Sequence, residues 1–329
     1  MTTEFELIEK LKAGWKCGND VKIGPGDDAS ALHLEACENK LFLQTVDLLV
    51  EGVHFRKNWG SAYQLGWKSL AVNLSDIAAM GGQPLHTHLS LAVPGTWSEV
   101  EISEFMEGFK ALADQYKISL LGGDLSRSGG PLMIAGTANG TVAANQVITR
   151  RGAKSGDVIW VSGPLGSAEA GLRLLKEEKF ADDYEELLNA FLKPSPEVEL
   201  GMLCASSGLV TALIDLSDGL AGDLGHVLKA SGVGATLEEE KFPITQTLQN
   251  VAARNNWNIT DLLLRGGEDY KLLGCTPETK FDQFRNLVNE QLGKTISRIG
   301  SITSEQGLVL NYRDGRCEKV NPTSFDHFA

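Results

Sequence analysis

The sequence predicts a protein of the α/β class, in an α/β or α+β arrangement, built from two domains. Its 329 residues exceed the length at which one hydrophobic core usually stops growing, so two cores are expected. Strand-like and helix-like patterns follow one another through the first 145 or so residues. The stretch "ITRRGAKSGD" at residues 148–157 then interrupts the pattern with basic residues and glycine. We therefore expect an N-terminal domain at residues 1–148 and a C-terminal domain at residues 149–329.

The N-terminal domain is predicted to alternate strands with helices. Helix 61–80 is the clearest, because Leu70 and Leu74 belong to an apolar stripe and Gly81 ends it. A strand over about 40–46 leads directly into Asp47. The other expected elements are a helix at 4–11, a strand at 29–35, a strand at 85–93, a helix at 99–116, and strands at 118–124 and 132–142.

The C-terminal domain is predicted to continue the same alternation. A strand at 157–163 precedes a helix at 167–178, and a further helix begins after Pro196. The stretch at 210–232 then reads as a strand followed by a helix. In both domains, strands are expected to end in aspartate.

Composition excludes several classes of function. The formal net charge of −13 opposes general binding to nucleic acid or to an anionic membrane. The N-terminal residues carry charges between their apolar positions, so they predict neither a signal peptide nor a membrane span. The five cysteines are widely spaced and form no C-x-x-C pair, which favours ordinary packing in a reduced cytoplasm.

The stretch "GPGDDA" at residues 24–29 formally matches a dinucleotide-binding fingerprint. We reject this interpretation because Pro25 lacks a backbone N–H donor, Asp27 and Asp28 would repel a pyrophosphate, and a strand pattern follows. There is also no P-loop motif in the sequence.

Aspartates stand instead at the ends of apolar elements. Asp76 is the sharpest case, because it lies in the last turn of its helix, where the helix dipole disfavours a carboxylate. Carboxylates that converge on one site need hard cations, and oxygen ligands favour Mg²⁺ with bound polyphosphate. The residues concerned are Asp27, Asp28, Asp47, Asp76, Asp124, Asp215 and Asp218.

Eight motifs occur in the order expected of one known family. They are "GPGDDAS", "VDLLVEGVHF", "AVNLSDIAAMGGQP", "LLGGDLSR", "ITRRGAKSGD", "IDLSDGLAGDL", "LRGGEDYKLL" and "FDHF". From about residue 5 to its end, the chain resembles the thiamine-monophosphate kinase family of the aminoimidazole ribonucleotide synthetase-like superfamily.

The resemblance implies transfer of the γ-phosphoryl group of ATP to thiamine monophosphate, with several Mg²⁺ ions, in a homodimer whose N-terminal domains form a barrel across the interface. It places Asp28, Thr45, Val46, Asp47, Asp76, Asp124, Asp215 and Asp218 at metal positions. The positions that it assigns to ATP binding are Asp28, Gly123, Asp124, Arg150 and Ser217. The positions that it assigns to contact with thiamine monophosphate are His54, Glu268 and Phe325. No side chain is expected to form a covalent intermediate. Asp223 falls within the helix that follows, five residues past Asp218, and is expected only to support Asp218.

The chain departs from the family pattern at Val46, Leu125, Ser167 and Lys271. At Val46 only the backbone carbonyl could contact a metal ion. At Ser167 the family commonly has Asp, and at Lys271 it usually has an acidic residue, so the roles of those acids do not carry over.

Three alternatives remain open on the residues alone. Other superfamily enzymes, such as aminoimidazole ribonucleotide synthetase or selenophosphate synthetase, would use the same metals on another acceptor. A non-catalytic nucleotide-binding protein is disfavoured by the intact aspartates. His86 and His88, two residues apart on one strand, could form half of a metal site.

Overall fold

The computed structural model describes residues 18, 21–23, 31–32 and 39–322. The expected helix at 4–11 lies outside these residues, as do Asp27, Asp28 and Phe325. The chain divides into two compact units. The first contains the described residues up to Ile77 together with Gln83–Asn145, and the second contains Ala78–Gly82 and the described residues from Gln146 onwards.

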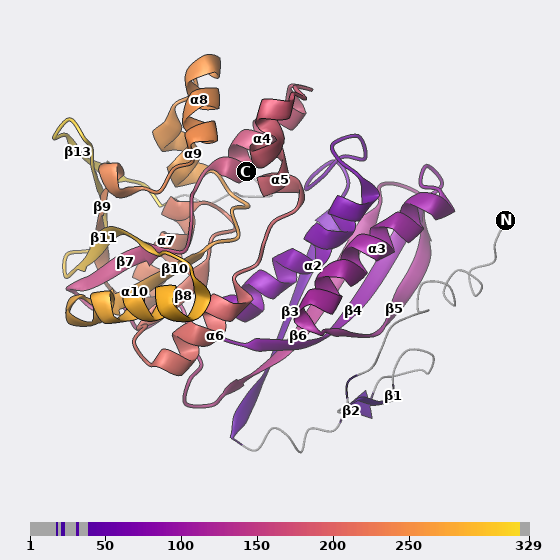
Figure 1. Ribbon diagram of the computed structural model, residues 1–329, viewed down its shortest axis with the longest axis horizontal. Helices are drawn as coiled ribbons and strands as arrows, with labels where there is room; N and C mark the ends of the chain where they lie inside the picture. The colour runs from indigo at the N-terminus through magenta and orange to yellow at the C-terminus, as the bar shows by residue number, and fades with distance from the viewer. Residues whose placement is uncertain (1–17, 19–20, 24–30, 33–38, 323–329) are drawn as a thin grey trace. The chain divides into compact units, whose positions relative to one another are not determined.

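The first unit is a four-stranded sheet with two long helices against one face (Figure 1). The strand order is β3-β6-β4-β5, with β4 and β5 parallel and the other pairs antiparallel. A separate short pair, β1 and β2, is antiparallel. The elements are β1 Val21–Ile23, β2 Ala31–Leu32, β3 Lys40–Val50, α2 Ala62–Ala79, β4 Gln83–Pro94, α3 Glu99–Tyr116, β5 Ser119–Ser128 and β6 Met133–Ala143.

Helices α2 and α3 pack closely because a glycine on each helix lies against the backbone of the other. A Cβ atom on Gly66 would lie 1.8 Å from the carbonyl oxygen of Phe105, and one on Gly108 would lie 1.8 Å from that of Tyr63. Any larger residue would push the helices apart. Ser98 caps α3 through a reciprocal capping box with Glu101, as an S-x-x-E pattern predicts.

The second unit is a seven-stranded sheet in the order β13-β12-β9-β11-β7-β10-β8, antiparallel except for β12 and β9. Its strands are β7 Asp157–Val161, β8 Ala212–Asp215, β9 Gly234–Glu238, β10 Leu272–Pro277, β11 Ser297–Thr303, β12 Gly307–Asn311 and β13 Cys317–Val320. Its helices are α4 Ser167–Lys176, η2 Asp182–Tyr184, α5 Glu185–Leu192, α6 Val198–Ser207, α7 Leu220–Ser231, η3 Glu239–Lys241, α8 Gln246–Asn255, α9 Ile259–Arg265 and α10 Glu278–Leu292.

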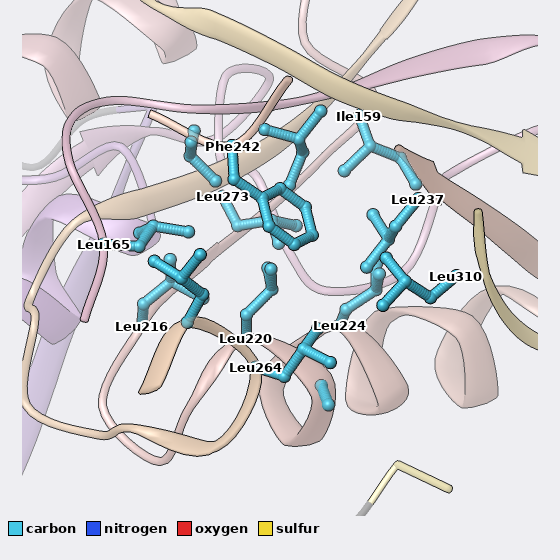
Figure 2. Packing of buried hydrophobic residues seen from close by; sticks show 14 of the residues in the cluster. Ile159, Leu165, Leu216, Leu220, Leu224, Leu237, Phe242, Leu264, Leu273 and Leu310 are labelled. Atoms are coloured by element: carbon cyan, nitrogen blue, oxygen red, sulfur yellow. The ribbon is translucent and has the colours of Figure 1, made fainter. Parts of the chain in front are cut away.

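The core of the second unit lies on both faces of its central strands, because β7 is buried at every position. Ile159 faces a cluster of leucines from α7, α9 and neighbouring strands (Figure 2). Trp160 points the other way, where its ring packs 5.3 Å from that of Phe284 on α10. Gly274 makes room for this indole, since a Cβ there would lie 2.1 Å from the Trp160 ring. This continuous burial agrees with the apolar run "VIWV" at residues 158–161.

The structure confirms the α/β class and most of the expected elements. Two expectations about strand ends are wrong, because β3 continues through Asp47 to Val50 and β5 continues through Asp124 to Ser128. In each case the hydrogen-bonded ladder with the neighbouring strand extends beyond the aspartate. None of the helices in the described residues combines the length and the hydropathy that crossing a bilayer requires.

Candidate active site

The first group of acids lies between β3 and α2. The hydroxyl of Thr45 donates a 2.5 Å hydrogen bond to Oδ2 of Asp76. Asp47, two residues further along β3, stands on the same face of the sheet as Thr45. Burial, and then the charge of Asp76, raise the pKa of Asp47 to about 7. These two carboxylates therefore repel each other in a partly buried place.

A glycine on the neighbouring strand lets α2 approach this place. Gly136 stands opposite Asp47 in the sheet, and a Cβ on it would lie 2.8 Å from the amide nitrogen of Asn73. Asn73 precedes Asp76 by three residues, about one helical turn. The close contact at Gly136 thus brings the last turn of α2 over Thr45 and Asp47.

Asp124 and Asp47 do not belong to the same row of residues that pair across the strands of the sheet. The row of Asp47 runs through Gly136 to Leu89 and Gly123, whereas Asp124 pairs with Ser90. Asp124 is exposed and accepts a 2.9 Å hydrogen bond from the Ser126 hydroxyl.

A loop after β3 carries His54. Nδ1 of His54 accepts a 2.9 Å hydrogen bond from the backbone N–H of Val50, so the neutral ring carries its proton on Nε2. Glu51 anchors the same loop by accepting from the indole N–H of Trp97 at 3.2 Å and from the N–H of Leu132 at 3.1 Å. Sequence reasoning missed Glu51 and Trp97, and nothing in their local pattern distinguishes them.

Lys57 continues this anchoring. Its ammonium group lies 2.7 Å from Glu101 and over the ring of Trp97 at 5.1 Å. The hydrogen bond from Lys57, with those from Ser98, lowers the pKa of Glu101 to about 2. The loop that presents His54 is therefore tied to the start of α3.

The second group of acids follows β8. Asp215 ends this strand and is buried, as the sequence predicts. The backbone N–H of Asp218 donates a 3.1 Å hydrogen bond to the carboxylate of Asp223, which lies in the first turn of α7. Burial, and then the charge of Asp215, raise the pKa of Asp223 to about 8. Asp223 thus supports Asp218, as expected, and this bond fixes the loop that carries Ser217 and Asp218.

The loop Gly266–Tyr270 packs against this second group. The N–H of Glu268 donates to the carbonyl of Ser217 at 2.7 Å, and the N–H of Tyr270 donates to that of Leu216 at 2.8 Å. Glu268 and Tyr270 have φ angles of 65° and 47°, in the left-handed region that residues with a Cβ rarely adopt. The structure therefore places Glu268 beside Ser217.

The remaining candidate residues are Arg150 and the pair His86 and His88. Arg150 is exposed near the start of the second unit, and its carbonyl accepts a 3.4 Å hydrogen bond from Ser231. Burial, and then the charge of His86, lower the pKa of His88. Over the described residues, no group of three or more His, Cys, Asp or Glu side chains has the arrangement of a metal site. The histidine pair thus acquires no third ligand among them.

Comparison with known proteins identifies the class. A family model described as AIR synthase related protein, N-terminal domain, matches residues 26–142, and the model of the corresponding C-terminal domain matches residues 154–313. The fold is thus that of an AIR synthase related protein.

Individual relatives narrow this class. The thiamine-monophosphate kinase of Bacillus subtilis is 36% identical over 99% of this chain and 99% of its own length. The crystal structure of thiamine-monophosphate kinase from Stenotrophomonas maltophilia is 39% identical, with a TM-score of 0.83 over 95% of this chain and 97% of the other. A structure described as AaThiL complexed with AMPPCP and TMP is 30% identical, with a TM-score of 0.79 over 99% of this chain and 97% of the other. The chain belongs to the thiamine-monophosphate kinase family.

Proposed function

We propose that this chain transfers the γ-phosphoryl group of ATP to the phosphate of thiamine monophosphate, giving thiamine diphosphate and ADP, in the last step of thiamine diphosphate synthesis. Membership of the family supports the reaction, and a relative binds AMPPCP, an analogue of ATP, together with TMP. The observation that carries the proposal is the presence of mutually repelling carboxylates in each unit, Asp47 with Asp76 and Asp215 with Asp223.

These carboxylates suit Mg²⁺. They offer oxygen ligands only, and the raised pKa values of Asp47 and Asp223 mark places where a cation would relieve repulsion. Mg²⁺ supplies charge neutralisation and alignment of the phosphates. The residues proposed to hold several Mg²⁺ ions are Asp28, Thr45, Val46, Asp47, Asp76, Asp124, Asp215 and Asp218, with Val46 using its backbone carbonyl.

The substrates are proposed to meet different residues. Asp28, Gly123, Asp124, Arg150 and Ser217 serve ATP, and His54, Glu268 and Phe325 serve thiamine monophosphate. Gly123 has no room for a side chain, since a Cβ would lie 1.7 Å from the carbonyl of Leu89. His54 would offer Nε2–H to an anion, because Val50 occupies Nδ1. Glu268 supplies a negative charge for the cationic thiazolium.

The transfer is proposed to be direct and in line, with no phosphoenzyme. Phosphoryl transfer needs mainly positioning and charge neutralisation, which the carboxylates and their metals provide without a covalent nucleophile. Inversion of configuration at a chiral γ-phosphorus is expected, and overall retention would overturn direct transfer.

We propose that the active form is a homodimer with a barrel formed across its interface. One face of β3 carries the exposed apolar side chains of Phe42, Val46 and Leu48, at 45%, 65% and 54% exposure, and Met133 on β6 adds to them. Phe42→Glu is expected to halve the mass in light scattering, whereas an unchanged dimer would reject this face.

We propose that the chain consists of two domains with different roles, which meet between residues 148 and 149. Residues 1–148 would serve metal, ATP phosphates and dimerisation, and residues 149–329 would serve ATP and substrate. The N-terminal family model ends at residue 142 and the C-terminal one begins at residue 154, on either side of this boundary.

We also propose a cytoplasmic location. Cys204 and Cys275 are free, and burial raises the pKa of both thiols, as in ordinary packing.

The test is the reaction itself. Incubation with ATP, Mg²⁺ and thiamine monophosphate should yield thiamine diphosphate, whereas unphosphorylated thiamine should yield none. Absence of thiamine diphosphate at high enzyme concentration would reject the function. ATP cleavage that depends on selenide or on an aminoimidazole precursor would assign the chain to another branch of the superfamily.

A further inference from the structure

Helix α4 is capped by a residue from a distant loop. Its N-cap is Gly166, which has no side chain, and the buried hydroxyl of its first residue, Ser167, makes no hydrogen bond within the part of the chain that the structure describes. Asp269 accepts instead from the N–H of Gly166 at 2.7 Å and from the N–H of Ala168 at 3.3 Å. A carboxylate is the favoured acceptor at a helix N-terminus.

The loop that supplies this carboxylate is held at three consecutive residues. Glu268 and Tyr270 donate their N–H groups to the segment after β8, and Asp269 between them reaches in the other direction, to α4. Both Glu268 and Tyr270 are in the left-handed region of φ, which needs such external support. A Cβ on Gly266 would lie 2.6 Å from Cβ of Glu169, so the start of the loop is also pressed against α4.

Among the residues that the structure describes, none forms a close ion pair with Asp269. Burial raises the pKa of Asp269 to about 7, while the two N–H groups and the charge of Lys271 oppose the rise. Lys271 itself lies 3.5 Å from Glu197. The carboxylate therefore depends on the backbone N–H groups of α4.

We propose that Asp269 is a positioning residue for recognition of the phosphoryl acceptor: by tying the Gly266–Tyr270 loop to α4, it holds Glu268 in the conformation that contacts thiamine monophosphate. This inference rests on the proposed function, in which Glu268 binds the acceptor. Asp269 itself does not touch the substrate. Its effect on catalysis passes through the backbone of Glu268.

The substitution Asp269→Asn keeps the shape of the side chain but turns one acceptor into a donor facing an N–H group. The KM for thiamine monophosphate is expected to rise about tenfold, the size typical of a lost hydrogen bond to a charged group. The KM for ATP and kcat should stay within about threefold, because Ser217 and Asp218 keep the support of Asp223. Wild-type enzyme without kinase activity would instead reject the proposed function itself.

A double-mutant cycle separates positioning from a general loss of stability. In a Glu268→Gln background, Asp269→Asn should change the KM for thiamine monophosphate by less than about twofold, because the residue through which it acts is already impaired. Additive effects of the two substitutions would overturn the proposal. So would an unchanged KM in the single variant.

Asp157 offers a matched control. It lies in the same unit and is buried, and its carboxylate also accepts two hydrogen bonds, from the N–H of Lys154 at 3.0 Å and from the Thr211 hydroxyl at 2.6 Å. Asp157→Asn should lower stability without raising the KM for thiamine monophosphate. If Asp269→Asn does not fold, Asp269→Ser, which retains one acceptor oxygen, is measured in its place. Loss of folding in both variants would assign Asp269 to stability alone and overturn its positioning role.

Discussion

The hydroxyl of Thr45 donates a 2.5 Å hydrogen bond to the carboxylate of Asp76, which joins the middle of β3 to the last turn of α2. This bond explains how an aspartate is held at the end of a helix where the dipole disfavours it by about 0.3 to 1 kcal/mol. It also sets Asp76 close enough to Asp47 for its charge to add to the rise in pKa that burial causes at Asp47.

Thr45→Val should raise the Mg²⁺ concentration that the enzyme needs for activity. Valine keeps the shape but removes the donor, so Asp76 is less well oriented, and half-maximal activity should need roughly three- to tenfold more Mg²⁺. Thr87 is the matched control, since both threonines pair with Ala138 in the sheet. A Mg²⁺ titration that shifts as much in Thr87→Val as in Thr45→Val would contradict the role of Thr45.

Asp76→Asn should abolish turnover while leaving the fold intact. Activity is expected to fall about 100-fold or more, because a ligand charge is lost at the reaction centre. The melting temperature without Mg²⁺ should stay the same or rise, since the change removes repulsion with Asp47. Activity and thermal melting of one preparation provide the check, and retained turnover would remove Asp76 from the site.

The metal-free protein should lose stability as pH rises. Folding raises the pKa values of Asp47 and Asp223 to about 7 and about 8, so above about pH 4 the folded chain binds more protons than the unfolded chain. The resulting fall in stability extends up to about pH 8, where both groups ionise. Melting temperatures between about pH 6 and about pH 8.5 test this sign.

Mg²⁺ should oppose this loss, because it binds the ionised carboxylates. Its stabilising effect is expected to be larger at the upper end of the pH range than at the lower end. Asp223→Asn should flatten the metal-free pH profile. A profile that rises with pH, or a Mg²⁺ effect independent of pH, would speak against buried, mutually repelling acids.

Glu197→Gln should lower the free energy of unfolding. Glu197 is buried, at 5% exposure, and its carboxylate lies 2.5 Å from the ammonium group of Lys294 and 3.5 Å from that of Lys271. Because both lysines keep some solvent contact, the expected loss is about 1 to 3 kcal/mol rather than the value for a fully buried pair. Denaturant unfolding measures this loss. The substitution Glu199→Gln, at an exposed position in the first turn of α6, which Glu197 directly precedes, should change stability by less than about 0.5 kcal/mol. Equal losses in the two variants would deny Glu197 this role.

Strong local patterns predicted much of the fold. The helix expected at 61–80 is observed at Ala62–Ala79, because its apolar stripe and the glycines after it act locally. The ends of β3 and β5 could not be predicted in this way. They depend on which strands pair with them and in which register, and these partners lie far away in the sequence.

In the candidate site, too, the local contacts could be predicted from the sequence and the distant ones could not. Asp215, Asp218 and Asp223 form a local motif, and the sequence predicts their arrangement around the start of α7. The contacts of Glu51 with Trp97 and of Asp269 with Gly166 join segments 46 and 103 residues apart. Either acid taken alone has the sequence pattern of an ordinary loop residue, so only the fold identifies its partner.

The most direct test of the central claim follows the phosphorus atom. ATP labelled at the γ-phosphate is incubated with the enzyme, Mg²⁺ and thiamine monophosphate, and the products are separated. The label is expected in the terminal phosphate of thiamine diphosphate, in equal amount to ADP, and removal of Mg²⁺ is expected to stop the transfer. Release of the label as inorganic phosphate, with no labelled thiamine diphosphate, would show that this chain does not phosphorylate thiamine monophosphate.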